Sequence, residues 1–102
     1  MVPEITDEQR LAALEKAKEA RRARHSIRAA LKAGTLDPVR AIGMEDARRM
    51  KVRVFLASLP GVGGATADEA LRVLGIAPSR RIGGLGCRQV ERLTDWIVNR
   101  EH

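Results

Sequence analysis

Residues 59–66, with the sequence LPGVGGAT, form a turn whose backbone could hold an anion. Pro60 cannot continue a helix, and the three glycines that follow leave the backbone uncovered by side chains. A new helix is expected from Thr66, and the N–H groups of a first helical turn have no partners inside the helix, so they and the helix dipole favour a phosphate. The other interpretation is a purely steric corner. The candidate contact residues of this first turn are Leu59, Pro60, Gly61, Val62, Gly63, Gly64, Ala65 and Thr66.

A second segment rich in helix breakers, IAPSRRIGGLG, covers residues 76–86. Ser79 can donate a hydrogen bond to a phosphate, Arg80 and Arg81 supply positive charge, and three glycines let the backbone approach. Two polar residues at the start of the next expected helix lie near the same surface. Alternatively, the glycines only reverse the chain and the arginines are only solvated. The candidate contact residues of this second turn are Ser79, Arg80, Arg81, Gly83, Gly84, Gly86, Arg88 and Gln89.

Side chains suited to catalysis or metal binding are few. The two histidines, His25 and His102, are not spaced with an acid and a nucleophile as covalent catalysis requires. Cys87 is the single cysteine, so the sequence offers neither a disulfide nor a Cys/His cluster for zinc. The turn at residues 59–66 lacks the Gly-Lys-Ser/Thr of a nucleotide-binding loop. We therefore expect no enzyme activity, no cofactor, no metal and no small-molecule substrate.

The composition favours a polyanionic partner. The 102 residues carry 19 Lys and Arg against 13 Asp and Glu, a formal net charge of +6. A field of this sign attracts nucleic acid or, less specifically, another acidic surface. No stretch approaches the roughly 20 apolar residues that span a bilayer, and the start MVPEITDEQR is not that of a signal peptide. We expect a cytoplasmic protein with no membrane partner.

The N-terminal third predicts one long helix. Thr6 and Gln9 fit a capping box, and neither Gly nor Pro follows until Gly34, which supplies a stop. In its second half a basic arc lies beside a narrow apolar strip made by Ile27 and Leu31. The first half has little to bury, so we expect it to project from the body. Additional contacts to a polyanion are predicted for Arg21, Arg24, Arg28 and Lys32 of this helix and for Arg49, Lys51 and Arg53 further along.

The rest of the sequence predicts a helical body. Helices are expected at residues 38–42, 50–59, 66–74 and 87–99, and an extra turn is expected to open near Glu45. Asp37 is expected to cap the first of these, and Thr66 with Glu69 to form a capping box on the third. No strand pattern occurs. The predicted fold is all-α: a long basic N-terminal helix at residues 1–34, joined to a compact four-helix body at residues 35–102 in a single folded unit.

Several segments together resemble one family. They are ITDEQRLAALEKAKEARRAR at residues 5–24, MKV at 50–52 and IAPSRRIGGLGCRQ at 76–89. The LPGVG stretch is also similar to the helix-hairpin-helix consensus, in which the apolar residue between the glycines, here Val62, packs into the core. Over nearly its whole length the sequence resembles the actinobacterial integration host factor family, of the mycobacterial and Streptomyces type. Its body resembles the helix-two-turns-helix of ribosomal protein S13.

The resemblance implies a nucleoid-associated protein that binds double-stranded DNA with low sequence specificity through its phosphates and alters its topology. It also implies a part in phage integration and gene regulation. In the family the hairpin turn contacts DNA as a lid, which matches residues 59–66, and a second contact region matches residues 77–89. The family carries several lysines in the lid where this chain has Gly61, Gly64 and Thr66, and a third arginine where it has Gly83. Fewer charges therefore reach the phosphates here.

An S13-like body would also suit RNA or the ribosome, and that is the alternative function. Recognition of single strands by stacking is not expected, because Phe55 and Trp96 are the two aromatic residues. We expect a monomer.

Overall fold

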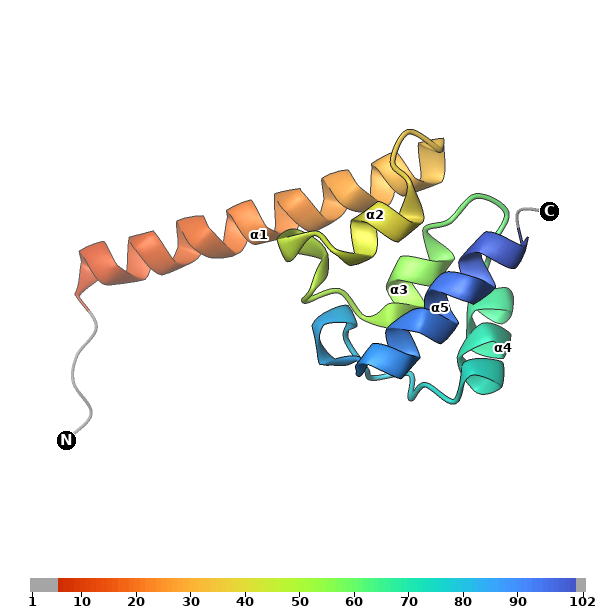
Figure 1. Ribbon diagram of the computed structural model, residues 1–102. Coiled ribbons are helices and arrows are strands. Elements are labelled where there is room, and N and C mark those ends of the chain that lie inside the picture. Colours follow the sequence, from red (N-terminus) through yellow and green to blue (C-terminus); the bar gives the residue numbers. More distant parts are fainter. Residues whose placement is uncertain (1–5, 101–102) are drawn as a thin grey trace.

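The computed structural model describes residues 6–100, which fold into helices (Figure 1). In chain order the elements are α1 (Asp7–Ala33), α2 (Pro38–Ile42), the 3-10 turn η1 (Glu45–Ala47), α3 (Val52–Ala57), α4 (Gly64–Leu74), the 3-10 turn η2 (Ile82–Gly84) and α5 (Cys87–Arg100). Among the described residues the β-type contact is an isolated antiparallel bridge between Lys51 and Arg81. The all-α prediction is confirmed. Expectations that concern residues 1–5 and His102 lie outside the described residues.

α1 begins and ends where the sequence predicts. Thr6 Oγ1 accepts a hydrogen bond from Gln9 N (3.1 Å), and Gln9 Oε1 accepts one from Thr6 N (3.1 Å), which completes the capping box. Gly34 ends the helix at φ +77°, in the left-handed region that glycine enters without steric cost. The short helix α2 likewise starts at its predicted cap, since Asp37 Oδ1 accepts from Val39 N (2.9 Å).

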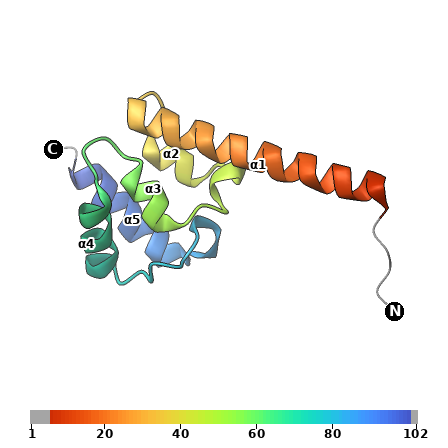
Figure 2. The same cartoon turned by 180° about the vertical axis from the view of Figure 1, so that it is seen from behind.

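Only the second half of α1 packs on the rest of the protein. Ile27 and Leu31 are buried, whereas Leu11 and Leu14 are 62% and 49% exposed. The radius of gyration is 16.1 Å, against about 13 Å for a compact chain of this length. Figures 1 and 2 show that the N-terminal half of α1 projects beyond the body. We call residues 7–20 the arm, and its projection agrees with the prediction.

The body encloses one core around Phe55 of α3. Phe55 and Leu93 are fully buried, and α3 packs on α4, α4 on α5, and α2 on α5. Ile27 and Leu31 of α1 belong to the same cluster of buried side chains. One face of α4 is apolar and faces the core, because its four members are all buried: Ala67, Ala70, Leu71 and Leu74.

α3 is shorter than the helix predicted for residues 50–59. It starts later because Met50 pairs with the second turn, where Ile82 N donates to Met50 O (2.9 Å). It also ends earlier, at Ala57, three residues before Pro60. The prediction was wrong at both ends. The pairing at its start fastens the second turn to the chain that leads into α3.

Candidate nucleic-acid interface

The first turn, residues 59–66, is held from inside by two buried side chains. Leu59 and Val62 are 2% and 5% exposed, and Val62 N donates to Leu59 O (3.1 Å). Gly61 lies between them at φ +75°, a conformation that a side chain would strain. The packing of Val62 in the core agrees with the prediction. Both apolar residues were predicted as contacts, but their burial makes them supports for the turn, while Pro60, Gly61 and Gly63 form its exposed surface.

The helix after this turn begins with unpartnered amides. Gly63 is the N-cap of α4, and it has no side chain to accept a hydrogen bond. The predicted capping box is wrong, because Thr66 is the third residue of the helix and not its N-cap. The Glu69 carboxylate accepts a hydrogen bond from Arg72 Nε (3.1 Å) and does not pair with the backbone N–H of Thr66. At this positive end of the helix dipole, three backbone N–H groups have no hydrogen-bond acceptor within residues 6–100. These open amides belong to Gly64, Ala65 and Thr66.

An ion pair fixes α4 to α3 beside the open amides. Arg53 Nε donates to Asp68 Oδ1 (2.7 Å), and a Cβ built at Gly64 would lie 3.0 Å from Arg53 Nη2. The hydrogen bond from Arg53 holds the pKa of the Asp68 carboxyl below its ordinary value, and the same bond raises the pKa of Arg53. Arg53, predicted among the additional contacts, therefore lies at the first turn and its guanidinium already binds a carboxylate.

The last residue of α5 also contacts the first turn. Arg100 Nη2 donates to Pro60 O (3.2 Å), and the Arg100 guanidinium lies 5.6 Å from the ring centre of Trp96. α5 runs one residue beyond its predicted end and so includes Arg100. Sequence reasoning missed this residue. The available signal was its spacing of four from Trp96, which places the two side chains on one helix face.

The backbone of the second turn, residues 76–86, is already used by the fold. Gly83 N donates to Arg48 O (2.8 Å), and Gly84 N to Arg81 O (2.9 Å). Gly86 N donates to Gln89 Oε1 (3.0 Å). The expectation that these glycines leave their backbone free for a phosphate is therefore wrong. A Cβ built at Gly83 would lie 3.1 Å from Arg48 Cβ, so this glycine serves close packing.

The second turn presents exposed, positively charged side chains that could contact an anion. Ser79, Arg80 and Arg81 are exposed, and together with Arg48 and Arg49 they line a hollow of about 460 Å³. The Arg81 guanidinium donates to Arg49 O, and Arg80 Nη1 donates to Gly84 O (3.3 Å), which holds both side chains at the hollow. The ion pairs found within residues 6–100 involve none of these four arginines. Their positive charge has no acidic partner in that part of the chain.

A second hollow, of about 470 Å³, adjoins the first and shares Arg49 and Arg81 with it. Three predicted contacts of α1 and Lys51 also line it. Lys32 lies further along α1, at a smaller hollow that Arg28 also lines. The structure thus gathers the predicted residues of α1, of the chain before α3 and of the second turn, and leaves out Arg53. We call this set the basic surface: Arg21, Arg24, Arg28, Lys32, Arg48, Arg49, Lys51, Arg80 and Arg81.

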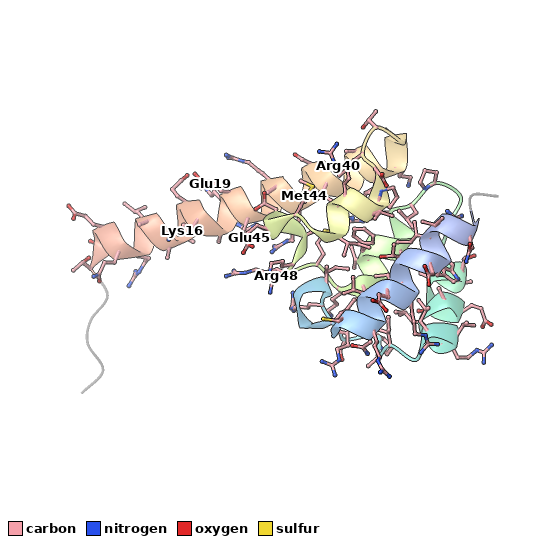
Figure 3. The ribbon with its side chains drawn as sticks, viewed as in Figure 1. Lys16, Glu19, Arg40, Met44, Glu45 and Arg48 are labelled. Carbon is pink, nitrogen blue, oxygen red and sulfur yellow. The ribbon has the colours of Figure 1, made fainter. Side chains whose placement is uncertain are left out.

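Acidic residues of η1 bound the basic surface on the side of the arm. Glu45 and Asp46 line a hollow together with Lys16 of the arm. Figure 3 shows Lys16, Glu45 and Arg48 grouped where the arm leaves the body. The two carboxylates oppose the positive potential there and limit how far it extends along α1.

α5 separates the first turn from the second. Arg100 at its C-terminal end contacts the first turn, while Gly86 immediately precedes its first residue. A helix of 14 residues spans about 20 Å, and Figures 1 and 2 show the two turns at its opposite ends. Arg88 and Gln89 lie beside the second turn, at the start of α5, in agreement with the prediction. The candidate interface therefore consists of two separate contact regions.

No three His, Cys, Asp or Glu side chains of residues 6–100 gather where they could hold a metal ion. None of the helices in that range is both long enough and apolar enough to cross a membrane.

Known proteins are similar to this chain in sequence and fold. The model of the S13-like H2TH domain family matches residues 20–96. An integration host factor of Mycobacterium tuberculosis is 44% identical over 100 residues, which cover 92% of this chain and 93% of that protein. The chain belongs to the integration host factor family. The integration host factor of Streptomyces coelicolor is 45% identical over 96 residues, covering 90% of each protein.

A solved member of the integration host factor family, described as sIHF bound to an 8 bp palindromic DNA, has the same fold. It aligns with a TM-score of 0.77 at 37% identity, covering 81% of this chain and 98% of that one. The S13-like match begins at residue 20, where the arm ends, and includes both glycine turns. The family resemblance inferred from the sequence is confirmed.

Proposed function

We propose that this member of the integration host factor family binds duplex DNA through its phosphates, with little sequence preference. By holding DNA at two regions it alters DNA topology, and it thereby supports phage integration and gene regulation at the nucleoid, in the cytoplasm. We propose that it is not an enzyme. The observation that carries the proposal is the placement of the open amides and the basic surface, two regions suited to anions, around the opposite ends of α5. A relative whose structure was solved with DNA supports the same partner.

At the first turn the proposed contact is a phosphate on the open amides. Three N–H groups and the helix dipole point at the same place, and glycine keeps that place free of side-chain bulk. The adjoining exposed backbone of Pro60, Gly61 and Gly63 lets a DNA strand approach closely. The hydroxyl of Thr66 is within the same first turn of α4 and can add a donor.

At the second turn the proposed contacts are guanidinium groups. Arg80 and Arg81, with Arg48 and Arg49 across the hollow, can each place two parallel N–H donors on a phosphate. Ser79 adds a hydroxyl, and Arg88 extends the positive charge onto α5. The α1 members of the basic surface continue this contact along the DNA backbone.

Low sequence specificity follows from what these groups touch. Amides and arginines directed at phosphates fix the position of a duplex but read no base edges. The deformability of the DNA then supplies whatever preference exists. We therefore expect similar affinities for duplexes of different sequence and a steep loss of affinity with salt.

The test compares the variant Arg80→Ala/Arg81→Ala with the wild-type chain on several unrelated duplexes. Fluorescence anisotropy from about 0.05 to 0.2 M salt gives the affinity and its salt dependence. We expect weaker binding on every duplex and a salt slope lower by up to about two units, because each lost phosphate contact removes about 0.9. The matched control is Arg10→Ala/Arg22→Ala, which removes the same charge from exposed positions of α1 outside the basic surface.

An equal loss in the control variant would mean that net charge alone drives binding and would remove the second turn from the interface. A structured RNA of similar length is measured in parallel at matched salt. Tighter binding of that RNA than of duplex DNA would contradict the proposed partner.

A further inference from the structure

The hollow between α1 and the second turn has the dimensions of a small-molecule site. Its volume of about 470 Å³ falls within the roughly 300–1,000 Å³ typical of such sites. α1 forms one wall, and the chain at residues 49–51 with Arg81 forms the other.

Most of the side chains that line this hollow are positively charged. Six of its side chains are Arg or Lys, and no Asp or Glu lines it. They are Arg21, Arg24, Arg28, Arg49, Lys51 and Arg81. Like charges held together raise the energy of the protein, and a bound polyanion relieves that repulsion. A polyphosphate group concentrates several negative charges in a small volume, whereas a DNA strand carries one charge per phosphate.

The walls of the hollow are fixed before any ligand arrives. α1 is anchored beneath the basic arc by the buried Ile27 and Leu31. On the other wall the bridge between Lys51 and Arg81 sets the spacing, and the Arg81 guanidinium donates to Arg49 O. A preformed site loses less entropy when it binds.

One part of the lining is not charged. Met50 is buried beneath the hollow, Val54 is half-buried beside it, and the His25 ring stands on α1. The Val54 side chain makes an apolar contact for a flat aromatic ring, and the His25 imidazole can stack on it. The hollow thus offers cations for phosphates and an apolar surface for a base.

We infer that this hollow binds a free nucleoside polyphosphate, as a regulatory ligand that competes with DNA. The competition rests on the proposed function, because Arg49 and Arg81 also line the hollow of the second turn. The phosphates occupy the cationic walls, and the base lies against Val54 and His25. Occupation of the hollow withdraws two arginines from the DNA contact and weakens it.

Calorimetric titration of the full chain at about 0.15 M salt tests the binding directly. The probes are ATP, GTP, inorganic tripolyphosphate and AMP. We expect the two nucleoside triphosphates to bind more tightly than tripolyphosphate, and AMP to give no measurable heat. Equal affinity for tripolyphosphate would overturn the nucleoside assignment.

Variants locate the site. Arg24→Ala/Arg28→Ala removes two cations from the wall on α1, where alanine preserves the helix, and should weaken triphosphate binding by about tenfold or more. The control Arg10→Ala/Arg22→Ala has the same net charge and should bind as the wild type does. An equal loss in both variants would overturn the site.

Competition separates this inference from the proposed function. A triphosphate should displace a labelled duplex from the wild-type chain, with an effect reduced in Arg24→Ala/Arg28→Ala. If the duplex binds but no triphosphate does, the inference fails and the proposed function stands. If the wild-type chain binds no duplex, the proposed function fails, and the competition that rests on it fails with it.

Discussion

The guanidinium of Arg100 donates a hydrogen bond to the carbonyl oxygen of Pro60, 3.2 Å away, and so joins the end of α5 to the first turn. The two residues lie 40 positions apart in the sequence. Trp96, one helical turn before Arg100, supports the guanidinium with its ring. The exposed backbone that we propose as a DNA contact is therefore held by a charged side chain of α5.

Replacing Arg100 with alanine should loosen the first turn without unfolding the protein. The hydrogen bond is exposed, so we expect little change in the free energy of unfolding, but a loss of duplex affinity of about threefold to tenfold because the turn is less ordered. Anisotropy gives the affinity, and the fluorescence of Trp96, the single tryptophan, should change with the loss of its cationic neighbour. In Asn99→Ala, at the neighbouring exposed position, both readouts should stay at wild-type values. Wild-type affinity in Arg100→Ala would contradict a supporting role.

Placing a carboxylate at the N-cap of α4 should separate stability from binding. Gly63 has extended backbone and open space around a built Cβ, so aspartate fits there. We expect Gly63→Asp to raise the free energy of unfolding by about 0.5–1 kcal/mol through capping and the helix dipole. It should lower duplex affinity by about tenfold, because the carboxylate occupies the place of the phosphate.

Urea unfolding and anisotropy measure the two effects of this change. Gly63→Ala is the control, since it adds a side chain without an acceptor and should bind DNA nearly as the wild type does. A Gly63→Asp variant that is stabilised and binds normally would exclude the open amides from the interface.

The two glycines of η2 should respond differently to alanine. A Cβ at Gly83 would lie 3.1 Å from Arg48 Cβ and Arg48 O, so Gly83→Ala should cost about 1–3 kcal/mol of stability through overpacking. At Gly84 the nearest atom is Arg80 Nη1, 4.0 Å away, and Gly84→Ala should stay within about 0.5 kcal/mol of the wild type. Urea midpoints of the two variants measure the difference. Equal midpoints would show that η2 does not pack on Arg48 as closely as described.

The ion pair between Arg53 and Asp68 should make a stability contribution that depends on pH. Because the folded state lowers the pKa of Asp68, the contribution is present above the ordinary value of 3.8 and is lost as the pH falls through the lowered one. The melting temperature of Asp68→Asn should therefore lie below that of the wild type near neutral pH and approach it in strong acid. A difference that is the same at every pH would mean that the pair does not act through the carboxylate charge.

The parts of the fold that local sequence determines were predictable. α1 has a capping box at one end, a glycine at the other and helix-forming residues between, so its bounds could be read directly. The buried face of α4 follows from a helical spacing of apolar residues, and Val62 follows from the hairpin consensus. These features depend on neighbours within a few positions.

The parts of the fold that long-range contacts determine could not be predicted from the sequence. The bridge from Lys51 to Arg81 joins segments 30 positions apart, and it replaced the expected first turn of α3 with extended backbone. No local sequence pattern predicts this bridge. A long-range hydrogen bond to Arg48 O occupies the Gly83 amide, and local bonds to Arg81 O and Gln89 Oε1 occupy those of Gly84 and Gly86. The sequence interpretation had offered these amides to a phosphate.

At the start of α4, tertiary contacts prevented a capping box that the local sequence predicts. Thr66 and Glu69 have the spacing of a capping box, but burial of Val62 and the ion pair of Asp68 with Arg53 fix a helix that starts two residues earlier. The amides at the start of α4 are open for that reason. The proposed contact region thus lies where tertiary packing replaced the capping box that local sequence predicts.

The arm has its own thermal behaviour because the body buries none of its side chains. Its helix rests on intrinsic propensity and one capping box, and a peptide helix of this length is marginal in water. On warming, the arm should fray while the core is still intact, so far-UV ellipticity would begin to decline before Trp96 reports any change. The rigid helix that projects from the body would then be shorter, while both glycine turns keep their structure.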